Sequence, residues 1–476
     1  MKKLLLAVVA VAAMESFGMD YDTWAMESNV SPFTATSRCW RVTLSTNGNV
    51  APDITAIESL PDNPDPSTLD SAGLLGMLLK SGYPIKKLQF RSTTGDAVSG
   101  IKTIILSENT YPEGLELRGL TALTDIRTTS DKYPHEISVN KLSQEYAFQN
   151  LKVTGAYVFK DLTASIGKGV FYGSCFSDVR LKGSFSGFSS TMTFQNCTNL
   201  SYFAAESTLP LTTLCAETAF NNTKLEYVYF PNVQALGKSA FAGNSNLKEV
   251  ILPSVTSFGT ETGIGSCANL WNVVFGTTEP MVISGKNARN SFGSADNPRM
   301  VFNTKVKPTF SGSNYFLLDA VPKLVVYVRK EADWKSVNDP THCAVVEQSG
   351  DKYYWRSGSG VTSWQHELRF MDTAVKLNVQ TNGVTVFTTI LPGMSGEDAV
   401  YTMPKTMVLP PEAKISSVQS LTPGVSAVRS ADKQGISVTV PAALFPTPDD
   451  NETKDLEVNV SFTPLFGDSG LAITIK

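Results

Sequence analysis

Hydrophobic positions recur along the middle of the chain with a nearly constant spacing. One apolar series advances in steps of 23, 26, 21 and 23 residues, through Phe171, Phe194, Phe220, Phe241 and Ile264. A second series keeps step with it near the ends of short alternating segments, at Val179, Phe203, Val228, Val250 and Val273. Two landmarks that stay in phase predict a structural repeat.

A single repeat unit is visible between residues 246 and 258. Leu247, Val250 and Leu252 alternate with outward positions, and Pro253 then ends the segment because proline cannot donate to a strand ladder. One coil cannot bury its own apolar edge, so coils must stack with parallel strands about 4.8 Å apart. The repeat therefore predicts a solenoid over residues 101–276.

These units resemble the BspA-like leucine-rich repeats of bacterial surface proteins, whose units look like I-G-x-x-A-F-x-x-C-x-x-L-x-x-V-x-L-P. The matching positions are Gly167, Gly237 and Gly259 for a turn, Phe171, Phe220 and Phe241 for the aromatic, Cys197 and Cys267 for the cysteine, and Leu200, Leu225, Leu247 and Leu270 for the leucine. Cys215 departs from the pattern by replacing a turn glycine. The resemblance implies a solenoid that binds other molecules at the bacterial surface.

The segments around the array have different patterns. Residues 19–100 combine expected strands at 39–46 and 85–92 with an expected helix at 67–82, which predicts a small α+β domain or cap. Residues 277–366 resemble the closing cap of such arrays, followed by a connecting hairpin. From 367 to 476 alternating segments separated by Pro, Gly and Asp predict an Ig-like β-sandwich. The fold class is thus a β-rich, multidomain leucine-rich-repeat protein.

The N-terminus predicts export. Two lysines precede an apolar run from Leu4 to Ala13, and small residues follow, which is typical of a signal peptide over residues 1–18. This run is shorter than the roughly 20 residues that span a bilayer, and no second long run follows, so we expect no integral membrane segment in the mature chain. The expected location is the medium or the cell surface.

Charge and cysteine content narrow the function classes. A formal charge of -4, with basic residues spread along the chain, provides no stripe for a phosphate backbone, so nucleic acid is not an expected partner. Six cysteines are too few for a disulfide framework in so long a chain. Cys175 and Cys197 fall on adjacent coils at slightly different offsets from the aromatic series, which favours free thiols over a bridge and leaves both open.

Catalytic and metal-binding patterns are weak. His135, His342 and His366 fall in different modules, so a triad or zinc site would need unrelated segments to meet. The glycines of IGKGVFYG are better read as repeat turns than as a phosphate loop. The acidic loops 62–66 and 449–452 lack the ligand spacing of an EF-type calcium loop and are expected to be solvated. We expect no catalytic residue, no cofactor and no metal, and therefore no enzyme.

Two sets of residues are candidates for binding. Side chains that flank the buried position of each strand must share the opposite face, which places Tyr202, Tyr227, Tyr229, Asp178, Arg180 and Glu249 on one stripe with apolar Ile251 and Val274 at its far end. Tyrosine suits recognition, and it is also simply a good strand former. The second set, Tyr353, Tyr354, Trp355 and Trp364, would either stack on sugars or pack within a hairpin that turns at Gly350 and Asp351.

The expected function is therefore that of an exported binding protein. Its partner is an extracellular protein or glycan of unknown identity, bound in protein–protein interaction or adhesion at the bacterial surface. The alternative is a glycan-binding surface protein that uses the sandwich or the aromatic segment 353–364.

Overall fold

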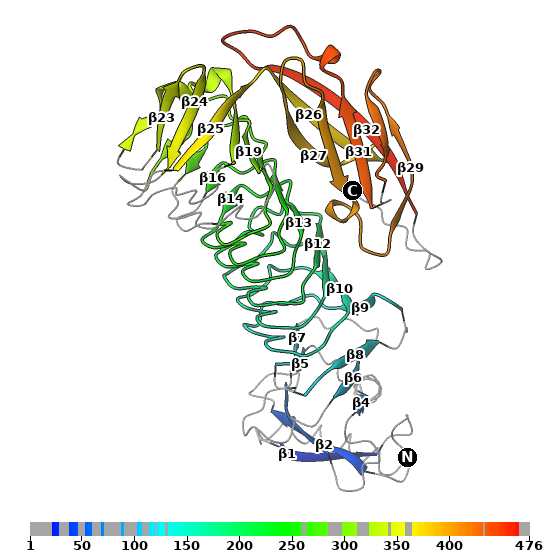
Figure 1. The fold of residues 1–476 in the computed structure, drawn as a ribbon. Helices are drawn as coiled ribbons and strands as arrows, with labels where there is room; N and C mark the ends of the chain where they lie inside the picture. The colour runs from blue at the N-terminus through cyan, green and yellow to red at the C-terminus, as the bar shows by residue number, and fades with distance from the viewer. Residues whose placement is uncertain are drawn as a thin grey trace. The chain divides into compact units, whose positions relative to one another are not determined.

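In the computed structural model, the residues that the structure describes are rich in β-strands and form almost no helix (Figure 1). It describes residues 132–258, 263–283, 298–311, 323–340, 344–357, 364–431 and 434–465, together with 21–27, 38–45, 53–59, 68–70, 87–89, 102–106, 114–118, 120 and 122–128. The chain divides into two compact units, Met1–Pro210 and Leu211–Lys476. In both units, stacked coils form a β-solenoid.

The first unit begins with a small antiparallel sheet of β1 (Tyr21–Glu27), β2 (Arg38–Ser45) and β3 (Asp53–Ser59). Two short parallel sheets follow. Their strands are β4 (Thr68–Asp70), β6 (Thr103–Leu106) and β8 (Asp125–Thr128) in one sheet, and β5 (Lys87–Gln89) and β7 (Gly114–Glu116) in another.

Some of the predictions for the N-terminal segment concern residues that the structure describes. The strands expected at 39–46 and 85–92 are found as β2 and β5. The start of the expected helix is the strand β4 instead, because Thr68–Asp70 pairs in parallel with Thr103–Ile105. The remainder of that helix and the signal segment lie outside the described residues, and the α+β assignment of 19–100 stays a prediction.

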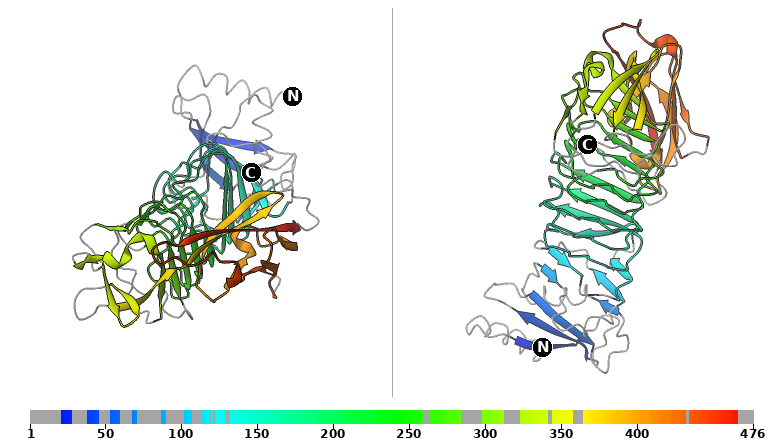
Figure 2. Two further views of the ribbon diagram at one scale, coloured as in Figure 1. Left: turned by 90° about the horizontal axis from the view of Figure 1, so that it is seen from above. Right: turned by 60° about the vertical axis from the view of Figure 1, so that its left-hand side comes forward.

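The regular coils of the first unit carry four parallel strands. These are β9 (His135–Ser138), β10 (Ala156–Leu162), β11 (Asp178–Gly183) and β12 (Tyr202–Ser207), in the sheet order β12-β11-β10-β9. Val179 lies opposite Phe203 in the ladder, as the second apolar series predicts. Figure 2 shows the strands of successive coils side by side.

The aromatic series forms stacked, fully buried columns. In the first unit the ring centroids of Phe148 and Phe171 lie 5.3 Å apart, and those of Phe171 and Phe194 lie 4.8 Å apart with an interplanar angle of 3°. In the second unit Phe220 and Phe241 stack at 5.6 Å. The predicted stacking is therefore confirmed within each unit, and Phe148 extends it into an upstream coil.

In each unit a column of polar side chains runs beside the aromatic column, three residues after each Phe position and after Ile264. Its members are buried: Ser174, Cys197, Thr223, Asn244 and Cys267. Cys197 Sγ donates to the Phe171 carbonyl at 2.8 Å, and Asn244 Nδ2 donates to the Phe220 carbonyl at 2.8 Å. The repeat cysteine thus hydrogen-bonds the preceding coil, and asparagine does the same where it replaces cysteine.

The tight turns of the coils occur on both sides of each aromatic residue. Backbone φ is positive two residues before it and two residues after it, at Tyr146, Asn150, Gly169, Gly173, Met192, Asn196, Thr218, Asn222, Ser239, Gly243 and Ser266. Gly167 serves differently, because a Cβ there would lie 2.4 Å from the Ser143 carbonyl oxygen of the preceding coil. Gly237 also begins a turn, since its carbonyl accepts the Ala240 N–H at 3.3 Å, and Gly167 directly precedes one. What requires glycine at both positions is the close approach of the preceding backbone. Gly259 lies outside the described residues.

In the second unit a parallel ladder continues through the segment expected as a cap. It contains β13 (Tyr227–Tyr229), β15 (Glu249–Leu252), β17 (Asn272–Phe275), β19 (Arg299–Phe302), β21 (Val325–Arg329) and β25 (Trp364–Met371). The opposite side of the coils carries β14 (Ala235–Leu236), β16 (Ser257–Phe258), β18 (Val282–Ile283) and β20 (Thr309–Phe310).

Two short 3₁₀ turns and a hairpin close this ladder. The turns η1 (Lys330–Ala332) and η2 (Trp334–Ser336) follow β21. The antiparallel strands β22 (Asn338–Asp339), β23 (Ala344–Ser349) and β24 (Lys352–Ser357) come next, and β24 pairs with β25. The hairpin turns at Gly350 and Asp351, as predicted.

The residues from 372 to 465, hereafter the C-terminal module, form two sheets. One has the order β27-β26-β32-β29, and the other β28-β31-β30. The strands are β26 (Thr373–Thr381), β27 (Val384–Gly393), β28 (Ala399–Pro404), β29 (Lys414–Ser420), β30 (Ser426–Arg429), β31 (Gly435–Val440) and β32 (Lys454–Leu465).

The C-terminal module shares its hydrophobic core with the solenoid of the second unit. Side chains from both of its sheets, such as Val379 and Val438, belong to one buried cluster that also includes Ile251, Val274 and Val301 from β15, β17 and β19. This apolar contact determines which part of the predicted binding stripe is open to solvent.

Candidate binding surface

The predicted stripe residues lie where strand alternation places them within each unit. In the first unit Asp178 lies opposite Tyr202. In the second unit Tyr227 lies opposite Glu249, and Tyr229 lies opposite Ile251. The register reasoning is therefore correct strand by strand, but the environments of these side chains differ from those expected.

In the first unit the centre of the strand face is a buried ion pair. Arg180 donates to Asp178 through Nη2 at 2.6 Å and through Nε at 3.1 Å, and both side chains are less than a tenth exposed. The guanidinium carbon lies 5.4 Å from the centroid of the Tyr202 ring. The exposure expected for Asp178 and Arg180 is thus wrong, because the charges pair with each other beneath an aromatic ring.

More exposed charges surround that pair. Lys160 Nζ lies 3.0 Å from Glu136 Oε2, and Lys182 Nζ lies 3.2 Å from Glu206 Oε2. Each bridge joins neighbouring strands, and their side chains are between 24% and 44% exposed. We call the set Glu136, Lys160, Asp178, Arg180, Lys182, Tyr202 and Glu206 the charged strand face.

In the second unit Glu249 contacts the C-terminal module. It is only 2% exposed, and Tyr401 of β28 donates to its Oε2 at 2.9 Å. Asn272 Nδ2 donates to the same oxygen at 3.3 Å, and Arg299 Nε donates to Asn272 Oδ1 at 2.9 Å. Desolvation raises the pKa of Glu249 to about 7, although these hydrogen bonds and the Arg299 charge oppose the rise.

Tyr229 also contacts the C-terminal module. Its hydroxyl oxygen accepts a hydrogen bond from the Thr388 N–H at 3.0 Å, and its ring lies 4.7 Å from that of Phe387. Burial raises the pKa of Tyr229 to about 12. Tyr227 is half-buried, with Lys248 Nζ 5.5 Å from its ring centroid.

The expected exposure of the Glu249, Ile251 and Val274 end of the stripe is therefore wrong. Adjacent apolar side chains on neighbouring strands form a patch that is unfavourable in water, and the C-terminal module removes it from solvent. Glu249 is buried as a consequence of its position beside this patch. Whether any stripe residue binds a partner stays a prediction.

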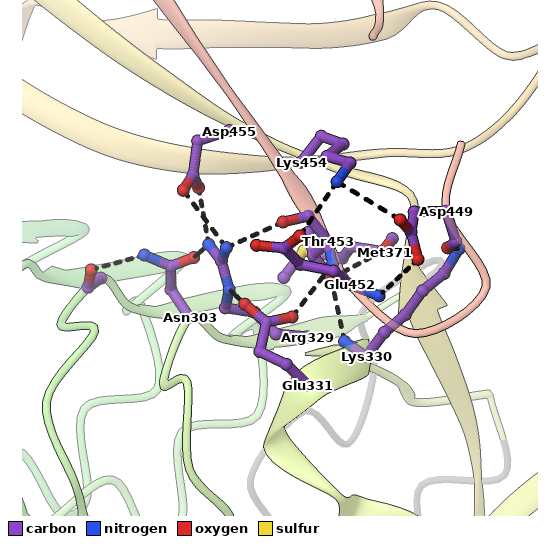
Figure 3. Close-up of polar contacts among 11 residues, drawn as sticks. Asn303, Arg329, Lys330, Glu331, Met371, Asp449, Glu452, Thr453, Lys454 and Asp455 are labelled. Carbon is purple, nitrogen blue, oxygen red and sulfur yellow. Dashed lines mark hydrogen bonds and ion pairs between the residues drawn. The ribbon is translucent and has the colours of Figure 1, made fainter. Parts of the chain in front are cut away.

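A second polar contact fastens the C-terminal module to the last coil (Figure 3). Arg329 is fully buried and donates to both carboxylate oxygens of Asp455, at 2.7 and 3.3 Å, and to the Thr453 carbonyl at 3.0 Å. Burial opposes its charge, but the hydrogen bonds to Asp455 and Glu331 prevail and raise its pKa. Sequence reasoning missed Arg329, because nothing distinguishes it from a residue that ends a surface strand.

The aromatic segment is largely occupied by packing. Trp355 is fully buried, with its ring 5.5 Å from that of Trp334 and 6.3 Å from that of Phe302. Tyr353 packs edge-on against Phe370, and Lys335 lies 5.1 Å from its ring. Trp355 thus offers no face to a sugar, and the side chain of Trp364 lies outside the described residues.

The structure also describes the predicted cysteines, one of the two acidic loops and His366. Cys175 and Cys197 are free thiols, and burial raises the pKa of Cys197 to about 12. In the 449–452 loop, Asp449 Oδ1 accepts the N–H groups of Asn451 and Glu452, so this carboxylate shapes its own turn. His366 is buried, whereas His342 and the 62–66 loop lie outside the described ranges.

Within the described part of the chain, no group of three or more His, Cys, Asp or Glu side chains is arranged to hold a metal ion. No described helix is long and apolar enough to cross a membrane.

Comparison with known families identifies the repeats. Residues 134–248 and 164–280 match the model of the BspA type leucine rich repeat region, which is found in six copies. No curated protein and no solved structure matches the chain. The family match thus covers the coils from β9 to β17 and does not extend to the C-terminal module.

Proposed function

We propose that this chain, a leucine-rich-repeat protein of the BspA type, is an exported binding protein that mediates protein–protein interaction or adhesion at the bacterial surface. The repeat family suggests surface interaction in general. The stack of coils also supports a binding function, because neighbouring strands hold side chains of different chemistry at a fixed spacing. In this proposal the protein acts by binding and not by catalysis.

The charged strand face of the first unit is the proposed contact surface. The observation that carries this assignment is that Lys160, Lys182 and Glu206 stay partly exposed around the buried Arg180–Asp178 pair. A buried, bidentate pair holds the centre rigid, and exposed charges at its rim steer the partner and select its orientation.

The same face in the second unit is assigned a structural role. Its apolar residues and Glu249 already contact the C-terminal module, so an outside partner would first have to displace that module. We further propose that the two-sheet C-terminal module is the predicted Ig-like sandwich, that residues 1–18 direct export, and that the mature protein is secreted or surface-held.

The test begins with arrays of extracellular proteins and of glycans, probed with the full chain. A protein that binds is then titrated against the double variant Lys160→Glu/Lys182→Glu. We expect at least tenfold weaker binding and a marked salt dependence, because the substitutions reverse two rim charges. Lys152→Glu changes an exposed lysine outside the face and serves as the matched control.

Equal affinity of the double variant and the control would remove the charged strand face from the proposal. Binding to glycans alone, unaffected by either variant, would replace the proposal with the glycan-binding alternative.

A further inference from the structure

A groove of about 910 Å³ lies where the C-terminal module meets the solenoid of the second unit. Its volume falls in the range of pockets that hold small ligands. Polar side chains that are exposed or partly exposed line both of its walls, among them Thr256, Thr278, Glu279, Lys376, Asp455 and Glu457. The groove therefore offers a ligand several hydrogen-bonding groups that solvent already reaches.

The wall formed by the C-terminal module places opposite charges side by side. Lys376 of β26 lies next to Glu457 of β32 in the parallel ladder, at a strand spacing of about 4.8 Å. Glu457 Oε1 accepts a hydrogen bond from Asn378 Nδ2 at 2.7 Å, and Thr388 Oγ1 donates to Asn378 Oδ1 at 3.0 Å. This chain of hydrogen bonds fixes one oxygen of Glu457 and leaves Oε2 without a protein partner in the described part of the chain.

Lys376 is not held by its neighbour. Its side chain is exposed and forms no ion pair or hydrogen bond with another described residue. The Glu457 carboxylate only accepts hydrogen bonds, whereas the Lys376 ammonium only donates them. A ligand that meets both must therefore present a donor and an acceptor next to each other. Adjacent hydroxyl groups satisfy this requirement, because each hydroxyl can donate and accept.

The wall formed by the solenoid is also held in place. In the turn after β17, Thr277 Oγ1 accepts the Glu279 N–H at 3.1 Å, and the Thr278 carbonyl accepts the Lys305 N–H at 3.1 Å. These bonds fix the position of the Thr278 hydroxyl and the Glu279 carboxylate, both of which are exposed. Thr256, on the preceding coil, adds a second hydroxyl to this wall.

The charges around the groove restrict the ligand further. Arg329 neutralises Asp455 and joins the two walls, which also share a hydrophobic core (Figure 3). The remaining carboxylates of Glu279 and Glu457 outnumber the single ammonium of Lys376. This small negative excess disfavours ligands that carry acidic groups.

We propose that this groove binds a short neutral oligosaccharide. One pair of adjacent sugar hydroxyls bridges the module wall, the first donating to Glu457 Oε2 and the second accepting from Lys376 Nζ. Further hydroxyls meet Thr278 and Glu279 on the solenoid wall. Groups that are already held in position lose little entropy on binding, which favours such a polar contact. The site is separate from the charged strand face and does not depend on it.

The probe is a panel of short glucans, mannans, galactans and N-acetylglucosamine oligomers, titrated into the full chain by calorimetry. We expect at least one of them to bind, and Thr278→Trp to abolish its binding by filling the groove from an exposed turn. Glu457→Gln and Lys376→Met should each weaken binding at least tenfold, because each removes a charge-assisted hydrogen bond. The matched controls Glu397→Gln and Lys414→Met change exposed side chains elsewhere on the C-terminal module and should leave affinity within twofold.

Deoxy analogues of the bound saccharide identify the hydroxyl pair. Removal of the hydroxyl that meets Lys376 should weaken binding to the parent chain at least tenfold and leave the affinity of Lys376→Met unchanged, since both changes remove the same hydrogen bond. Removal of one neighbouring hydroxyl should also weaken binding to the parent chain at least tenfold. Melting temperatures close to that of the parent chain verify that the variants are folded.

Three results would overturn the proposal: a panel without a binding member, a saccharide that binds Thr278→Trp as well as the parent chain, or additive effects of Lys376→Met and of every deoxy substitution. Tighter binding of acidic than of neutral saccharides would contradict the charge argument. Peptide binding that Thr278→Trp blocks, in the absence of saccharide binding, would reassign the groove to peptides. None of these results bears on the Lys160→Glu/Lys182→Glu experiment, so the two proposals fail independently.

Discussion

Glu249 makes the contact between solenoid and C-terminal module dependent on pH. Its pKa rises from 4.5 to about 7, chiefly through desolvation at the Tyr401 contact. The folded chain therefore holds a proton that the unfolded chain has lost between these two values. The contribution of Glu249 to the free energy of unfolding is therefore greatest below pH 4.5. It falls as the pH rises to about 7 and stays at the lower level above that pH.

The size of the effect follows from the shift. Each pKa unit corresponds to about 1.4 kcal/mol, so burying ionised Glu249 costs about 3 kcal/mol at pH 8.5. Glu249→Gln imitates the protonated acid and keeps an acceptor for the Tyr401 hydroxyl. The variant should unfold at nearly the parent free energy at pH 4.5 and be more stable by about 3 kcal/mol at pH 8.5.

The groups facing Glu249 do not mask this signal. Tyr401, Asn272 and Arg299 contact it or act on its charge, and Tyr227 lies nearby on β13. Burial raises the pKa of both Tyr401 and Tyr227, so neither tyrosine ionises between pH 4.5 and 8.5. Burial lowers the pKa of Arg299, but arginine stays protonated over this range.

The assay is calorimetry or urea unfolding of the full chain at several pH values, following the transition of the second unit. Glu397→Gln removes an exposed carboxylate and is the matched control. Parallel pH profiles of the parent chain and Glu249→Gln would refute the reasoning, because they would show that Glu249 is not buried against Tyr401.

Three further changes test the packing. Phe241→Ala removes a ring from the Phe220 stack and should cost about 3 to 5 kcal/mol in the free energy of unfolding, measured by calorimetry; an unchanged melting transition would contradict the stack. Asn244→Ala leaves the carbonyls of Phe220 and Phe241 and the Thr223 N–H without their partner, and should cost about 3 kcal/mol or more in urea unfolding, whereas a loss below about 1 kcal/mol would argue against the polar column. Tyr229→Phe removes the acceptor of the Thr388 N–H and should cost about 1 to 2 kcal/mol, together with faster amide exchange at Thr388; unaltered exchange there would mean that the contact is absent.

Local repetition was readable from the sequence alone. The aromatic series and the Val series specify stacked coils, because each coil repeats the same burial problem and neighbouring coils solve it identically. Short-range pattern accounts for three observed features: Val250 pairs with Val273, Phe171 stacks on Phe194, and the hairpin turns at Gly350. The positive φ angles of Met192 and Thr218 could not be predicted from the sequence, because methionine and threonine have no preference for positive φ. Only the register of the coil imposes this conformation on them.

Long-range contacts were decided by tertiary structure. Alternation correctly placed Glu249 on the strand face, but only the fold brings Tyr401, 152 residues later, onto that carboxylate. Arg329 meets Asp455, and Ile390 meets Ile251 and Val274, for the same reason. A periodic pattern determines which side of a strand a residue occupies, whereas the partner on that side depends on how a distant module packs, and this module has no repeat of the solenoid period to reveal its docking.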